Sequence, residues 1–300
     1  MDRKKDGVVK RGNRLGFWAF RTAARTFGLR GAYGLLSIVC LYYLAFDRSA
    51  VEATMAYVRR RFRDHGRFRR LGDVYRIFIE QGKSLIDRYA VLSGSAPFEI
   101  GNKGLDDLRK TLQTTGKGVI LLTAHVGNWQ VAMTALQRLG RTVHLLMRPE
   151  DNAAVRAALN IDQDHGSVRI LSSDGPLGGV LEAVSAVNAG EVVSIMGDRA
   201  YGYRSLDAEF MGERVHFPIG AFSIAAAARC PVIVLLSAKV SANRYMVDLS
   251  NVIEPPVGAG RAKQEAVSRC VREFSRILEG YVAEHPYQWF VFRDIWKSNE

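Results

Sequence analysis

The chain has 300 residues, of which 48% are hydrophobic and 24% are charged. This composition excludes a disordered or low-complexity protein and is enough for one large α/β core with an appendage. The formal net charge of +12 predicts acidic partners, such as an anionic membrane, an acidic protein or a nucleic acid. The three cysteines, Cys40, Cys230 and Cys270, are far apart and odd in number, which argues against a disulfide framework.

The N-terminal region combines a basic start with an uncharged segment. Residues 1–14 are rich in Lys and Arg, and residues 31–46 contain no charged side chain. As a helix, this run spans roughly 24 Å, short of the ~30 Å hydrocarbon core of a bilayer. Tyr33, Tyr42 and Tyr43 lie toward its ends, as in an aromatic belt. We predict a membrane-embedded or interfacial anchor; the alternative is a buried core helix.

The orientation of this segment depends on whether it spans the membrane. A basic N-terminus is expected to stay in the cytoplasm, so a spanning helix would place the rest of the chain outside. A re-entrant or interfacial helix would keep it inside. The short run, with Arg21, Arg25 and Arg30 just before it, favours the interfacial arrangement.

Residues 51–94 are predicted to be helical, with a break near His65 and Gly66. This region holds a basic cluster that is a solvated helix face, a dock for anionic lipid head groups or a nucleic-acid site. No nucleic-acid-binding motif accompanies it, so lipid is favoured over nucleic acid. The cluster consists of Arg59, Arg60, Arg61, Arg63, Arg67, Arg69 and Arg70.

From Pro97 onward, short apolar runs alternate with helical patterns. This alternation predicts an α/β fold with a mixed, largely parallel central sheet covered by helices. Expected domains are 1–50, basic and membrane-associated, and 51–300, with helical residues 51–96 and an α/β core at 97–300. Expected strands are 98–100, 119–122, 142–147, 168–171, 192–196, 232–238 and 244–249; expected helices are 105–115, 128–139, 180–188, 219–229 and 264–282.

Most catalytic motifs fail in this sequence, but His125 has a suggestive position. Gly82-Lys83-Ser84 lacks the first glycine of a phosphate-binding loop, there is no Gly-x-Ser-x-Gly, and the histidines show no metal spacing. We therefore expect no metal and no cofactor. His125 follows a predicted strand and precedes a helix, whose N-terminus favours the neutral imidazole that a general base needs. Gly127 and nearby free amides would allow close approach and oxyanion stabilisation.

Five blocks of sequence, in order, resemble the lipid A late-acyltransferase family of the lysophospholipid acyltransferase-like superfamily. The resemblance extends over nearly the whole chain, including an N-terminal membrane-associated segment. The blocks are GKGVILLTAHVGNWQ (116–130), LMRPED (146–151), GEVVSIMGDRAYG (190–202), FPIGAFSIAAAARCPVIVLL (217–236) and HPYQWFVFRDIW (285–296).

The resemblance implies a metal-free acyltransferase at the cytoplasmic face of a bacterial inner membrane. It implies transfer of a fatty acyl chain from acyl carrier protein or acyl-coenzyme A to a hydroxyl of a lipid or glycolipid. Further expected partners are anionic phospholipids, and no nucleic acid is expected. His125 would be the general base. The predicted substrate-binding residues are Gly127, Asn128, Trp129, Arg148, Asp198, Arg199, Pro218 and Gly220.

Gln130 departs from the pattern that the resemblance implies, because the family has Asp or Glu at this position. A Gln oxygen can accept the second imidazole N–H and hold one tautomer, but it supplies no charge. Asp198 or Glu150 is then the candidate carboxylate, unless the acceptor is unusually acidic. Otherwise the chain is a catalytically weak homologue that acts as a lipid-binding or scaffold protein.

Overall fold

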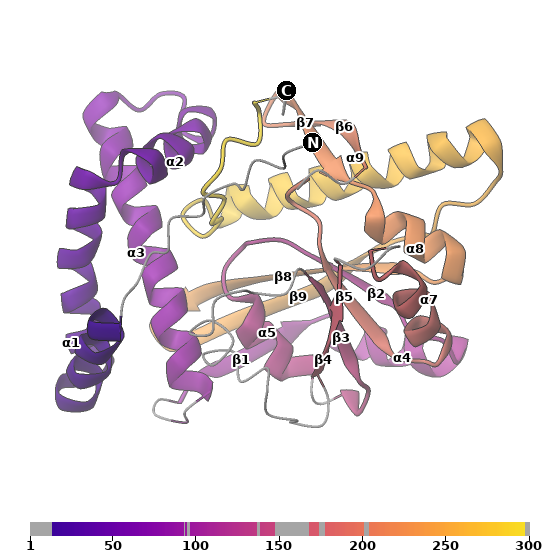
Figure 1. Cartoon of the computed structure of the whole chain (residues 1–300), viewed down its shortest axis with the longest axis horizontal. Helices are drawn as coiled ribbons and strands as arrows, with labels where there is room; N and C mark the ends of the chain where they lie inside the picture. Colours follow the sequence, from indigo (N-terminus) through magenta and orange to yellow (C-terminus); the bar gives the residue numbers. More distant parts are fainter. Residues whose placement is uncertain are drawn as a thin grey trace, which may run out of the picture.

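A computed structural model describes residues 14–92, 94, 97–136, 139–147, 168–173, 178–200 and 204–297. Its centre is a sheet of seven strands in the order β1-β9-β8-β2-β5-β3-β4 (Figure 1). β2, β3, β4, β5 and β8 are parallel to one another, whereas β9 is antiparallel to β8 and β1 pairs parallel with β9. The predicted mixed, largely parallel sheet is therefore confirmed. The strands are β1 (Glu99–Lys103), β2 (Ile120–Thr123), β3 (Val143–Met147), β4 (Val168–Ser172), β5 (Val192–Met196), β8 (Val232–Ser241) and β9 (Arg244–Ile253).

Helices cover both faces of this sheet, because its central strands are apolar on both sides. Along β2, Ile120 and Leu122 belong to one hydrophobic cluster and Leu121 to the other, as the alternation of side chains in a strand requires. α7, α8 and α9 contribute to the first cluster, and α4 and α5 to the second. These helices are α4 (Leu105–Thr115), α5 (Trp129–Leu136), α7 (Val180–Asn188), α8 (Gly220–Ala228) and α9 (Gly260–Glu284).

Three N-terminal helices form a separate layer at one end of the sheet (Figure 1). They are α1 (Arg14–Phe46), α2 (Arg48–Arg61) and α3 (Arg67–Leu92), and the predicted break near His65 falls between the last two. α1 packs along α3, where Leu36 lies so close to Gly82 that a Cβ there would be 2.2 Å from its Cδ1. The expected division at residue 50 stays a prediction.

The outer face of α1 is apolar and exposed. Arg25–Phe46 is long and apolar enough to cross a membrane, with a mean hydropathy of 1.5, and only 17% of that window is buried. This low burial contradicts a buried core helix. Tyr33 is not part of an outward-facing belt, because its hydroxyl donates to buried Asp87. The exposed side chains are Phe27, Ile38, Leu41, Tyr42 and Phe46.

One element was not predicted: the hairpin of β6 (Ser205–Phe210) and β7 (Glu213–Pro218). It packs on α9, and its inward side chains Phe210 and Phe217 form an edge-to-face pair. Pro218 ends β7, and α8 begins at Gly220. The prediction that helix begins at 219 was thus one residue early.

Candidate active site

His125 and Asp198 meet at the carboxyl ends of two neighbouring strands. Thr123 of β2 pairs with Met196 of β5, so His125 and Asp198 each lie two residues beyond this pair. The carboxyl edge of parallel strands is where α/β proteins place their ligands. His125 Nδ1 is 2.8 Å from Asp198 Oδ1, and the backbone N–H of His125 donates to Oδ2 over 3.0 Å.

The Asp198 carboxylate is fully buried, yet it remains charged. It accepts a third hydrogen bond, from the indole N–H of Trp289, over 3.1 Å. Burial alone would raise the pKa of Asp198, but the charge of His125, their hydrogen bonds and the nearby Arg199 guanidinium lower it well below its usual range. The imidazole is 27% exposed, so its other nitrogen can face a substrate while Nδ1 is held.

A segment near the C-terminus holds the histidine loop in place. Gly127 donates its N–H to the carbonyl of Gln288 over 2.7 Å, and Phe290 donates to the carbonyl of His125 over 2.8 Å. Between them, Trp289 forms an antiparallel bridge with Val126. The loop and the carboxylate are therefore both held by residues 288–290, far from either in sequence.

Gly127 and Asn128 serve the fold directly. Gly127 has φ +60, and a Cβ there would lie 2.0 Å from the carbonyl oxygen of Ser237, so the glycine permits close approach to β8 and not to a ligand. The Asn128 N–H donates to the Ser237 hydroxyl, and its side chain accepts from Val131 as the N-cap of α5. Both amides are used within the protein, which argues against their expected role as oxyanion donors.

Trp129 and Gln130 open α5 beside the histidine. As the first residue of the helix, Trp129 has a backbone N–H with no acceptor inside it. Gln130 is half-buried, and among the described residues the imidazole pairs with Asp198 and not with Gln130. Of the alternatives that the sequence left open, the structure brings Asp198 to the histidine.

The remaining predicted site residues are placed less directly. Arg148 and Glu150 lie outside the described residues. Arg199 donates from Nη2 to the carbonyl of Phe290 over 2.6 Å, so it also fastens the C-terminal segment. Pro218 ends β7 and Gly220 begins α8.

A His–carboxylate pair is not diagnostic by itself, since the described residues contain four. The other three are His65–Asp73, His144–Glu191 and His216–Asp207. Among these, His125–Asp198 is the pair at the carboxyl ends of β2 and β5 with a carboxylate that is 0% exposed. Within the described residues, no group of three or more His, Cys, Asp or Glu side chains is arranged to hold a metal.

These observations define an α/β protein with a buried His–carboxylate pair at the carboxyl edge of its sheet. Residues 84–298 match the family described as bacterial lipid A biosynthesis acyltransferase, and the chain belongs to that family. It is therefore an acyltransferase of lipid biosynthesis, as the sequence blocks predicted.

Two further comparisons are less informative. A comparison with curated protein sequences found no match. Among solved structures, the chain is similar to the crystal structure of the 1-acyl-sn-glycerophosphate (LPA) acyltransferase PlsC from Thermotoga maritima. The identity is 12%, the TM-score is 0.36, and the match covers 82% of this chain and 97% of that chain.

Proposed function

We propose that this protein transfers a fatty acyl chain from a thioester, on acyl carrier protein or coenzyme A, to a hydroxyl of a lipid or glycolipid, with His125 as general base. The observation that carries the proposal is the 2.8 Å contact of His125 Nδ1 with the fully buried Asp198. The Asp198 carboxylate takes the role of the Asp or Glu that the family has at position 130, where this chain has Gln130. It holds one tautomer and stabilises the imidazolium that forms.

In the proposed reaction, His125 Nε2 accepts the proton of the acceptor hydroxyl as its oxygen attacks the thioester carbonyl. A C–O bond forms and a tetrahedral intermediate follows. When the C–S bond breaks, the sulfur leaves as a thiolate, and the imidazolium donates to it the proton that came from the acceptor hydroxyl. Proton and electrons balance without an oxidant, a reductant or a metal.

The oxyanion of that intermediate needs hydrogen-bond donors. We assign this role to the N–H of Trp129, because it opens α5, carries the helix's partial positive charge and has no acceptor within the helix. Arg148 remains a predicted second donor or head-group contact, outside the described residues.

We further propose that the N-terminal layer rests on the cytoplasmic face of a bacterial inner membrane. The exposed apolar face of α1 supports this, and so does Phe68, which is 87% exposed between Arg67 and Arg69 at the start of α3. An apolar side chain between two exposed arginines fits an anionic bilayer surface. Four members of the predicted basic cluster instead contact the protein: Arg60 pairs with Glu213, and Arg61, Arg63 and Arg70 donate to backbone carbonyls.

The catalytic proposal is tested with the full chain in detergent micelles. The donors are lauroyl-acyl carrier protein and palmitoyl-coenzyme A; the acceptors are an underacylated lipid A and a lysophospholipid. Mass spectrometry detects the acylated product. We expect His125→Ala to lower kcat by about 10²–10⁴-fold, the usual contribution of a general base. His216→Ala, which alters an exposed His–Asp pair between β7 and β6, is the control and keeps wild-type activity.

The rival function is a lipid-binding or scaffold protein with weak catalysis. It predicts equal thioester turnover in wild type and His125→Ala, and that result would overturn the catalytic proposal. A large gain from Gln130→Glu in an otherwise inactive protein would favour a degenerate enzyme.

The membrane proposal is tested by sedimentation with phosphatidylglycerol vesicles. We expect the triple variant Arg67→Gln, Phe68→Ser and Arg69→Gln to lose most of its binding. The matched control is Leu181→Ser, which changes a different exposed apolar side chain, on α7, and binds as wild type. Unchanged binding of the triple variant would exclude this docking surface.

A further inference from the structure

A second buried carboxylate, which the reaction does not use, lies beneath α1. Asp87 of α3 is 0% exposed and accepts from Lys239 Nζ and from the Tyr245 hydroxyl, each over 2.6 Å. Lys239 is 10% exposed, and its ammonium lies 5.0 Å from the ring centre of Tyr33 and 5.2 Å from that of Phe98. The charges are thus enclosed by aromatic rings, where a polar contact is stronger than at the surface.

Tyr33 joins this cluster to the apolar N-terminal helix. Its hydroxyl donates to Asp87 Oδ1 and accepts from Lys239 Nζ over 2.8 Å. The pKa of Tyr33 is raised, by burial first and then by its hydrogen bond to Asp87, so the hydroxyl stays protonated and remains a donor. One face of α1 is therefore bound to a charged pair while its outer face is apolar.

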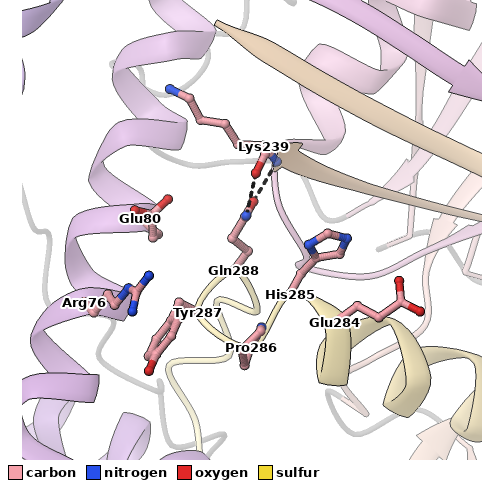
Figure 2. Close-up of a pocket in the computed structure, with 8 residues that line it drawn as sticks. All are labelled: Arg76, Glu80, Lys239, Glu284, His285, Pro286, Tyr287 and Gln288. Carbon is pink, nitrogen blue, oxygen red and sulfur yellow. Dashed lines mark hydrogen bonds between the residues drawn. The ribbon is translucent and has the colours of Figure 1, made fainter. Parts of the chain in front are cut away.

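The cluster also reaches the histidine loop, through Lys239 itself. The Gln288 side-chain amide clamps the backbone of Lys239: Oε1 accepts from its N–H over 2.8 Å and Nε2 donates to its carbonyl over 2.9 Å (Figure 2). The carbonyl of Gln288 accepts from Gly127. Lys239 and Gln288 also line a cavity of about 260 Å³, whose other lining residues include Arg76, His285 and Tyr287.

A second connection runs through α3. Ser84, three residues before Asp87, donates its hydroxyl to the Gly127 carbonyl over 3.1 Å. The Ser84 carbonyl accepts from Asn128 Nδ2 over 2.7 Å. The same stretch of α3 therefore contacts α1 on one side and the histidine loop on the other.

We infer that Tyr33, Asp87 and Lys239 form a positioning unit that makes the geometry of the His125 loop depend on how α1 is seated against α3. The inference rests on the proposed role of His125 as base. Tyr33 couples the position of α1 to this unit, because Asp87 and Lys239 bind its hydroxyl. Gln288 and Ser84 connect the unit to the loop, because each hydrogen-bonds to the backbone of Gly127. A change far from a reacting group that displaces this group slightly lowers kcat.

The test compares two tyrosine hydroxyls at the same helix–helix interface. Tyr33→Phe removes the bond to Asp87. Tyr75→Phe removes a bond across the same interface, from the Tyr75 hydroxyl to the Ser37 carbonyl at 3.2 Å, which involves neither Asp87 nor Lys239. We expect Tyr33→Phe to lower kcat about tenfold with KM unchanged, and Tyr75→Phe to retain the wild-type kcat. Equal kcat values for the two variants would overturn the inference.

A readout that does not need turnover separates this inference from the proposed function. Amide hydrogen exchange at Gly127, whose N–H is held by Gln288, should be faster in Tyr33→Phe than in Tyr75→Phe. If exchange is the same in both variants while His125→Ala remains inactive, the coupling is wrong and the catalytic role stands. If exchange differs but His125→Ala is fully active, the coupling stands and its catalytic meaning fails.

Discussion

Asp198 and Asp87 are two fully buried carboxylates among the described residues; each accepts three hydrogen bonds, but their surroundings differ. Asp198 accepts twice from His125 and once from Trp289. Asp87 accepts from two phenols and an ammonium. The imidazole that pairs with Asp198 is 27% exposed, whereas the ammonium that pairs with Asp87 is 10% exposed.

This difference shows which buried charge is available for chemistry. A carboxylate contributes to proton transfer only if its partner can exchange a proton with a substrate, which is the role proposed for His125. A carboxylate whose partners stay protonated fixes geometry instead. The predictions below test this contrast.

The largest expected effect is on catalysis by Asp198→Asn. Loss of the charge should lower kcat by up to about 10⁴-fold, the loss known for the neutralised aspartate of a serine protease triad. The matched change at the other carboxylate, Asp87→Asn, should lower kcat by no more than about tenfold. Steady-state acyl transfer measures both; comparable losses would remove the distinction between the two sites.

The largest expected effect on stability is that of Lys239→Met, which leaves Asp87 buried without its cation. Removing one partner of a buried pair costs about 3–5 kcal/mol of unfolding free energy. Chemical denaturation of the full chain measures it. Lys103→Met, which removes the surface partner of Asp248 at 3.7 Å, is the control, with a cost of about 1 kcal/mol or less.

Trp289→Phe probes how the active carboxylate is held. Its ring still packs on Tyr57, but Asp198 loses the indole N–H and binds the imidazolium more tightly. We expect kcat/KM to fall about tenfold, consistent with a lost charge-assisted hydrogen bond. Because the imidazolium is bound more tightly, the acid limb of the pH profile of kcat/KM should move to higher pH.

Trp296→Phe is the control for this change, since its indole N–H donates to the Phe210 carbonyl and not to Asp198. Its acid limb should match that of wild type. A Trp289→Phe profile with an unmoved acid limb would mean that the tryptophan only packs.

Gln130→Glu has the smallest expected effect. Because Asp198 already holds Nδ1 of His125, a second carboxylate at the start of α5 should change kcat by no more than about threefold, a difference of under 1 kcal/mol. A gain of two orders of magnitude would mean that Asp198 does not replace the missing acid.

Much of the fold was predictable because its signals are local. α4, α7 and β5 have the predicted bounds, and glycine follows α4 directly at position 116, with φ +62. The β6–β7 hairpin was missed because its strands are buried on one side only, at Ala208, Phe210, Val215 and Phe217, and carry charges between them. Such short alternating runs are weak signals without a partner strand.

The candidate site was predictable in its parts but not in its pairing. Each of the two residues follows an apolar strand, so both were predicted to lie at the rim of the sheet. Trp289 and Gln288 were missed as contacts of the site, since an aromatic block near the C-terminus is equally typical of core or membrane contact.

The sequence by itself determined the family and the alternating α/β elements, and it singled out His125 as the candidate base, because these depend on the order of residues along the chain. Only the tertiary structure brought a carboxylate, that of Asp198, into contact with the imidazole. Gln130 is the near neighbour in sequence, but the pairing of β2 with β5 brings Asp198 to 2.8 Å from His125 Nδ1. Contacts between strands join residues by register and not by distance along the chain.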